Sequence, residues 1–162
     1  MLVSILFKTG AREEAAELAR ETLRLRREVL GDTDVATLRS MDDLAKLSND
    51  PQEKERLLQE ALSGCRQLGS ADDDLESALQ NSLALHYLST GKLEDADRLS
   101  REALARTRLA SGDEHPNTIV GMLNRAGVLR QINRLEQARP LLAEAVEASQ
   151  RTLGDDHALT LS

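Results

Sequence analysis

The sequence predicts an all-α solenoid built from helix–turn–helix repeats about 42 residues long. The composition gives the first indication: with one Phe, one Tyr and no Trp, the core has to come from Leu and Ala, which are strong helix formers. Self-similarity gives the second, because GKLEDA (residues 91–96) returns 42 residues later as NRLEQA (residues 133–138). A unit of this size cannot bury its apolar face alone, so its copies are expected to stack.

The repeat extends along most of the chain. The same offset aligns GDEH (residues 112–115) with GDDH (residues 154–157), and EAL (60–62) with EAL (102–104). The segment ETL (21–23) lies only 39 residues before EAL (60–62), so one repeat is three residues shorter. At these offsets, one column of apolar residues consists of Leu18, Leu57, Leu99 and Leu141, and a second consists of Leu23, Leu62, Leu104 and Val146. These registers predict repeat units at residues 1–31, 32–69, 70–111 and 112–153, with a stub at 154–162.

Each unit is expected to contain two helices. In the third unit these run over residues 73–89 and 93–110, with a turn at Thr90 and Gly91. Gly10, Gly91 and Asn133 share a column and suit a helix C-cap, since Gly and Asn tolerate the left-handed conformation. The short repeat carries Asn49-Asp50-Pro51 instead, where Asp50 can cap the next helix and Pro51 suits its first position.

Further positions bear on helix ends. His115 precedes Pro116 and shares a column with Asp34 and Asp73, so all three are expected to be N-caps, with Asp73 and Glu76 at capping-box spacing. A metal site at His115 and His157 is the alternative, but side chains one repeat apart lie too far apart to share one zinc ion. Pro140 falls inside the last long helix, where we expect either a kink or a helix that begins near it.

The segments LGDTDVAT (30–37), GDEHPNT (112–118) and LGDDHALT (153–160), with NSLALHY (81–87) and GKLEDA (91–96), resemble the tetratricopeptide repeats of kinesin light chains. The resemblance covers essentially the whole chain, although LGSADDD (68–74) lacks the His-Pro step. It implies a right-handed α-solenoid of antiparallel helix pairs, a tetratricopeptide-like superhelix of about seven helices plus a terminal stub. It also implies one domain, residues 1–162, that binds a peptide or protein partner.

In this family the first helices of successive repeats line the concave groove. Carried over to this chain, the resemblance gives three clusters of candidate peptide-binding residues: Arg39, Asp42, Asp43 and Lys46; Ala78, Asn81, Ser82, Leu85 and Ser89; Asn124, Gly127, Arg130 and Gln131. It further implies that Asn81 and Asn124 bond the backbone of an extended peptide, since an amide both donates and accepts. Asp42 and Asp43 would make one end acidic, and Arg125 with Arg130 would make the other basic. The alternative is that these residues are ordinary polar surface.

Several functions are excluded by composition and pattern. The net charge of −7 and the pI near 5.0 argue against a nucleic-acid partner, which requires a basic face. No run of apolar residues is long enough to span a membrane. No catalytic constellation, cofactor-binding motif or metal-ligand set is found, so we expect no enzymatic activity, no cofactor and no metal. The single Cys65 is expected to be a buried thiol, His86 a packed side chain, and the protein cytoplasmic.

Some alternatives stay open. Arg20, Arg24 and Arg27 share a helix face that could contact acidic lipid or a partner, but interleaved glutamates favour a salt-bridged, solvated face. The leading functional hypothesis is a protein-interaction scaffold; the other is a regulatory or self-association segment of a larger signalling enzyme, such as a kinase or nucleotide-switch protein. Apolar residues at both ends suggest an excerpt of a longer array and end-to-end self-association.

Overall fold

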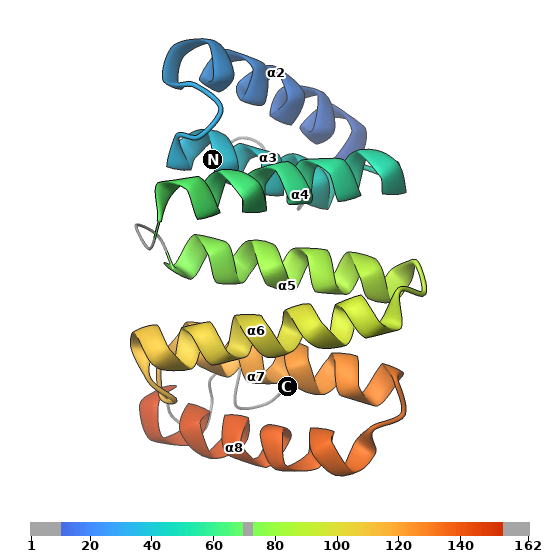
Figure 1. Ribbon diagram of the computed structural model, residues 1–162, viewed down its shortest axis with the longest axis vertical. Helices are drawn as coiled ribbons and strands as arrows, with labels where there is room; N and C mark the ends of the chain where they lie inside the picture. Colours follow the sequence, from blue (N-terminus) through green and yellow to red (C-terminus); the bar gives the residue numbers. More distant parts are fainter. Residues whose placement is uncertain (1–10, 70–72, 154–162) are drawn as a thin grey trace. The chain divides into compact units, whose positions relative to one another are not determined.

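The computed structural model describes residues 11–69 and 73–153, which form seven α-helices and no strand (Figure 1). They are α2 (Arg12–Leu30), α3 (Val35–Leu47), α4 (Pro51–Leu68), α5 (Asp73–Ser89), α6 (Leu93–Ser111), α7 (Pro116–Gln131) and α8 (Leu135–Leu153). The chain divides into two compact units, Met1–Ser82 and Leu83–Ser162, and each is described by itself. The predicted all-α fold of helix pairs is confirmed. The four repeat units stay a prediction, and the stub at 154–162 lies outside the described residues.

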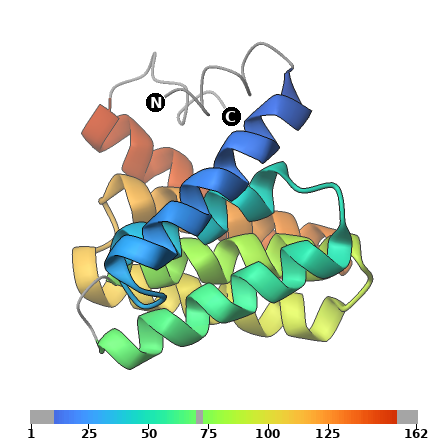
Figure 2. The same ribbon diagram turned by 90° about the horizontal axis from the view of Figure 1, so that it is seen from above.

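In the first unit, α3 packs against both α2 and α4. The short connection between α3 and α4 reverses the chain, so that α2 and α4 run in the same general direction (Figure 2). Leu38 and Met41 of α3 are completely buried, together with Leu57 and Leu58 of α4. Gly64 lets the two helices approach closely, because a Cβ there would lie 2.5 Å from the Leu38 side chain. The core is therefore leucine-rich and closely packed, as the composition predicts.

The second unit repeats this arrangement, with α7 packed against both α6 and α8. One core cluster joins all three helices through Leu104, Ile119, Met122, Ala145 and Ala148. A second cluster, formed by Ala126, Leu129 and Ala138, lies nearer the turn between α7 and α8. Small alanines on α8 facing larger side chains on α7 allow the close helix contact that the columns of small residues predicted.

The predicted N-caps are confirmed at three helices. Asp34 accepts a hydrogen bond from the backbone N–H of Ala36 at 2.8 Å, and Asp50 accepts one from Gln52 at 2.9 Å. His115 caps α7 through Nδ1, which accepts from the N–H of Asn117 at 3.2 Å. These side chains satisfy amides that have no partner within their helix. Asp73 is the first residue of α5, and the position before it lies outside the described residues.

The predicted left-handed turn residues are also confirmed where they are described. Gly91 has φ +79°, and Asn133, with φ +59°, shares the column and the conformation. Side chains other than Asn and Asp rarely adopt this region, which accounts for the residue types at this turn. Gly10, the third member of the column, lies outside the described residues.

The structure around Pro140 differs from one of the two predictions, a kink or a helix start near this residue. The helix α8 begins at Leu135 and continues through Pro140, so the prediction of a helix start near Pro140 is wrong. Ala138, one turn into the helix, is 97% buried against α7, and this packing holds the first turn in place. The proline ring points into solvent, where its bulk displaces no neighbouring helix. The expected kink stays a prediction.

Candidate interaction surfaces

The first candidate cluster lies on α3. Arg39, Asp43 and Lys46 are exposed at i, i+4, i+7 spacing and form a row of mixed charge. Asp42 is buried, and its Oδ2 pairs with Nζ of Lys46 at 2.5 Å, so its carboxylate is not part of the exposed row. Desolvation raises the pKa of the Asp43 carboxyl, against the opposing charge of Lys46. The face therefore presents one acidic and two basic side chains.

The second cluster lies on α5, which crosses from the first unit into the second. Asn81 and Ser82, at the end of the first unit, are half-buried. In the second unit, Leu85 is 48% exposed and Ser89 is exposed, its Oγ donating to the carbonyl of His86 at 2.7 Å. His86 itself is buried, which agrees with the prediction that it is packed. Ala78 is also exposed, and Leu85 is thus the larger apolar side chain that this cluster presents.

The third cluster lies on α7 and extends to its C-terminal end. Asn124 and Gly127 are half-buried, whereas Arg130 and Gln131 are exposed. Arg125 is a correction to the sequence analysis, which assigned it to a basic end of the groove. It is only 7% exposed and donates from Nη1 to Oδ1 of Asp97 on α6, at 2.5 Å. Arg130 is left as the basic residue of this cluster.

The burial of Arg125 has a clear physical reason. It occupies a column that holds Leu44 in the repeat of the first unit, and the residue facing it, Asp97, stands where α2 has Ala16. The side chain therefore enters the core as its apolar counterpart does, and Asp97 compensates its charge. Ser100 Oγ lies 2.9 Å from the same guanidinium nitrogen and completes its hydrogen bonding. The sequence signal for this pair is an arginine in a column that otherwise holds Leu44 and Leu83, in the repeat that follows the acid.

The electrostatics favour the ionised form of the Asp97 carboxyl. Burial alone raises the pKa of Asp97, but the hydrogen bond and charge of Arg125 and the charge of Arg134 outweigh it, so the pKa lies below its ordinary value. Arg134, in the turn before α8, pairs with the second carboxylate oxygen at 2.9 Å. Asp97 thus ties α6 to α7 and to the turn that follows it.

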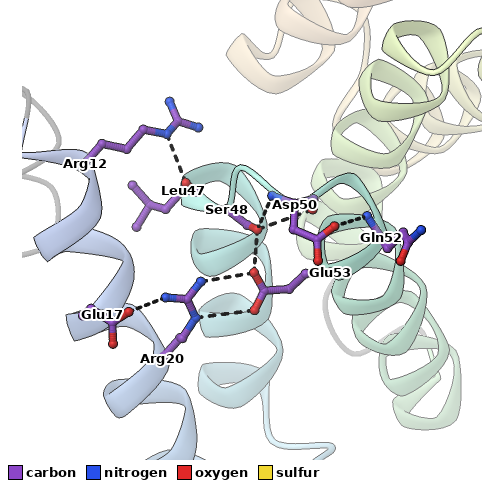
Figure 3. Close-up of polar contacts among 8 residues, drawn as sticks. All are labelled: Arg12, Glu17, Arg20, Leu47, Ser48, Asp50, Gln52 and Glu53. Atoms are coloured by element: carbon purple, nitrogen blue, oxygen red, sulfur yellow. Dashed lines mark hydrogen bonds and ion pairs between the residues drawn. The ribbon is translucent and has the colours of Figure 1, made fainter.

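The basic face of α2 proves to be salt-bridged, as the interleaved glutamates predicted. Arg20 pairs with Glu17 at 2.7 Å and reaches Glu53 on α4, as Figure 3 shows. Ser48 Oγ donates to Glu53 at 2.5 Å, and this bond, followed by the one from Arg20, lowers the pKa of Glu53. These side chains line a cleft of about 350 Å³ beside the short turn. Because its cations are already paired, the cleft is no ready anion site.

The short turn at residues 48–50 is braced by the same helix. Arg12 donates from Nε to the carbonyl of Leu47 at 3.0 Å and from Nη2 to that of Lys46 at 2.7 Å (Figure 3 draws the first of these bonds). Carbonyls at a helix C-terminus have no partner within the helix, and a cation there also favours the helix dipole. The turn has the same length as its counterparts at residues 90–92 and 132–134, whereas α3 has 13 residues and α7 has 16, and arginines of α2 hold the turn at both sides.

A second feature that the sequence analysis missed recurs in both units, and we call it the arginine clamp. Arg27 at the end of α2 pairs with Asp32 in the following loop, at 3.2 Å, and with Glu60 on α4. The equivalent residue Arg108 of α6 pairs with Asp113 at 2.9 Å and with Glu144 on α8 at 2.5 Å. The arginines, the loop aspartates and the helix glutamates each share a column, so the clamp joins α2 to α4 and α6 to α8.

No group of three or more His, Cys, Asp or Glu side chains in residues 11–69 and 73–153 could hold a metal ion. Over the same residues, no helix combines the length and the apolar character that a membrane crossing requires. Cys65 is buried, as predicted.

Known proteins show which family this chain is similar to. Two models of the tetratricopeptide repeat match the chain, over residues 1–35 and 75–150. Two crystal structures of nearly identical TPR-like repeats, from a Podosopora anserina protein described as a kinesin light chain, share the fold. Each has a TM-score of 0.79 at 22% identity, over 99% of this chain and 77% of the other. The crystal structure of BtubC (BKLC) from P. vanneervenii has a TM-score of 0.71 at 25% identity, over 93% of this chain and 59% of the other.

No curated protein matches the sequence. Both matching models describe the same repeat, and the fold agrees with that of the solved relatives. Repeats of this kind generally mediate protein–protein interaction, on a scaffold that is typically not enzymatic. The chain belongs to the tetratricopeptide repeat family.

Proposed function

We propose that this protein is an interaction module that binds a peptide of a protein partner through the exposed polar faces of its first helices, on α3 in the first unit and on α7 in the second. One observation carries the proposal. The helices α3 and α7 are each packed between two others, yet each keeps a polar row on its remaining face. Such rows contribute nothing to the core, and they occur on the helices that the family resemblance assigns to ligand binding.

The chemistry of the rows defines the ligand. Asn124 supplies an amide that can both donate to and accept from a peptide backbone, whereas Oδ1 of Asn81 is buried, which leaves the amide nitrogen of Asn81 as a donor. Arg39 and Arg130 add positive charge to the rows and Asp43 adds negative charge, while Lys46 is engaged by Asp42, so the ligand carries charges of both signs. Leu85, at 48% exposure, offers a contact for an apolar anchor. The ligand class is therefore a mixed-charge peptide with at least one apolar side chain.

A display library of unstructured peptides provides the test. Peptides selected by the full chain are synthesised and titrated against the chain and its variants by fluorescence anisotropy. Asn81→Ala combined with Asn124→Ala should weaken binding by about tenfold or more, since amides buried against a ligand backbone are costly to remove. Asn49→Ala, an exposed asparagine in the turn between α3 and α4, is the matched control and should leave affinity unchanged.

Two results would overturn the assignment. The first is a library that yields no peptide with mixed charge. The second is affinity that the Asn81→Ala, Asn124→Ala variant retains in full, which would move the binding surface elsewhere on the molecule.

A further inference from the structure

Gly127 lies well inside α7, although glycine is a poorer helix former than every other residue except proline. Other glycines of the chain have a structural reason. Gly91 has a positive φ, and a Cβ at Gly121 would meet the side chains of Leu104 and Thr107 at 3.4 Å. A Cβ at Gly127 would lie within 4 Å of nothing outside its own helix in residues 11–69 and 73–153. The packing of these residues therefore gives no reason for a glycine at position 127.

The position of Gly127 faces outward in the repeat. Its equivalents are Lys46 on α3 and Leu85 on α5, and both are exposed. The helix α3 packs against α2 and α4 and still leaves Lys46 exposed, so the exposure of this position does not depend on which helix follows. A long side chain protrudes there from α3 and from α5, whereas on α7 the helix backbone itself forms the surface.

Two polar side chains border this bare stretch of backbone. Asn124 precedes Gly127 by three residues and Arg130 follows it by three, and residues at this spacing are neighbours on a helix surface. Within residues 11–69 and 73–153, the Asn124 amide forms no hydrogen bond and the Arg130 guanidinium forms no ion pair. Most other arginines of this unit do pair with a carboxylate: Arg98, Arg108, Arg125, Arg134, Arg139 and Arg151. An amide and a cation that the described fold does not use thus lie on either side of Gly127.

We propose that the bound peptide crosses α7 at Gly127, with its main chain against the helix backbone, a peptide group bonded to Asn124 and a carboxylate side chain paired with Arg130. This inference rests on the proposed function and adds to it the point of closest approach on α7 and the sign of the charge recognised there. Glycine allows a second backbone to come close, and any side chain at position 127 would hold the peptide away. The ligand is therefore a peptide with an acidic residue next to the segment that lies over Gly127.

Gly127→Ala tests the close approach, with the peptides selected by the full chain from the display library as probes. The substitution should raise the urea midpoint, because alanine favours a helix and its methyl group meets nothing outside α7 in the described residues. The same methyl group would lie between the peptide and the helix, so the affinity measured by fluorescence anisotropy should fall by about tenfold. A glycine that is merely tolerated on the surface would give the gain in stability without the loss of affinity.

Gly127→Leu gives α7 the residue that α5 has at this position and should lower the affinity by more than Gly127→Ala does. Ala105→Leu is the matched control, because it adds a leucine side chain at an exposed position of α6, outside the polar rows, and should leave the affinity unchanged. Circular dichroism checks that the variants fold. If Gly127→Leu fails to fold, Gly127→Ala still decides the question.

A double-mutant cycle with Arg130→Gln tests the charge. Each acidic residue of a selected peptide is replaced in turn by its amide. One of these replacements should weaken binding to the parent chain by about tenfold and leave binding to Arg130→Gln unchanged, as expected when that carboxylate pairs with Arg130. Arg139→Gln, at an exposed arginine of α8, is the control and should respond as the parent does.

Two outcomes would overturn this inference and leave the proposed function in place. In the first, peptides that depend on Asn81 and Asn124 bind Gly127→Ala and Gly127→Leu as tightly as the parent. In the second, no acidic residue of the peptide couples to Arg130. A library that yields no binding peptide at all would overturn the proposed function and this inference with it.

Discussion

At the scale of single residues, the instructive feature is the pair Asp97 and Arg125. Arg125 stands where α3 has Leu44, and Asp97 stands where α2 has Ala16, although the same column holds Glu55 on α4. An unpaired charge at either position would be strongly destabilising, so the acid and the base are tolerated only together. The two side chains are 11% and 8% exposed and are joined by a direct hydrogen bond. The repeat thus accepts a polar contact in its core when both partners change at once.

This pair leads to a double-mutant prediction. Asp97→Ala leaves the Arg125 guanidinium buried without its partner and should lower the free energy of unfolding by about 3 kcal/mol or more. Asp97→Ala combined with Arg125→Leu recreates the residues of the first unit and should be within about 1 kcal/mol of the parent. Urea denaturation of the parent, both single variants and the double variant measures the coupling. Additive effects would show that the two side chains do not stabilise one another.

The lowered pKa of Asp97 predicts how this contribution depends on pH. An acid whose pKa is lower in the folded state stabilises the fold above its ordinary pKa, here 3.8, and loses that contribution as the pH falls through the folded value. The stability difference between the parent and Asp97→Asn should therefore be equal at about pH 7 and about pH 5, and smaller at about pH 3. Urea titrations at the three values check this, and a difference that grows toward low pH would contradict it.

At the scale of elements, helix ends are set locally and are therefore readable from sequence. Caps such as Asp34 and Asp50 act within two residues of the helix they begin, and left-handed positions such as Gly91 depend on the backbone alone. The helix α8 is the exception. Pro140 disfavours the interior of a helix, yet packing of Ala138 against α7 extends the helix five residues before it. Tertiary contacts here outweigh the local preference of proline against the interior of a helix, which the sequence alone predicts.

Pro140 accordingly lowers the free energy of unfolding, and a substitution should remove this effect. An amide at position 140 would reach the carbonyl of Glu136, and proline cannot supply it. Pro140→Ala should raise the free energy of unfolding by about 2 kcal/mol, which is the interior cost of proline less the entropy that it removes from the unfolded chain.

Urea denaturation measures the gain, and Pro116→Ala serves as the matched control. Pro116 lies at the first position of α7, where the missing amide needs no partner, so that its substitution should give no gain. Equal gains for the two variants would show that the position of Pro140 within α8 is not the source of the cost.

At the scale of the whole molecule, periodicity made the fold predictable while the candidate surfaces were only partly so. Columns of Leu and Ala at fixed offsets identify the helix pairs, because burial of one face has a regular spacing. The same columns could not show that Asp42 and Arg125 are buried, since a charged residue is expected to be exposed until its partner is known. Asp42 is buried beside Lys46, and Arg125 is buried against Asp97, which lies 28 residues away. The pairing of Arg125 with Asp97 is long-range and is set by packing, not by local pattern.

The arginine clamp has a consequence for how such a chain can be rearranged. Arg27 and Arg108 each bind one carboxylate in their own loop and one on the following second helix, always at matching columns. A duplicated or transplanted unit therefore carries an arginine that can pair with the following unit and a glutamate that can pair with the preceding unit. Copies of this unit joined in tandem would be matched at every junction without redesign, which makes the pair of helices a modular building block.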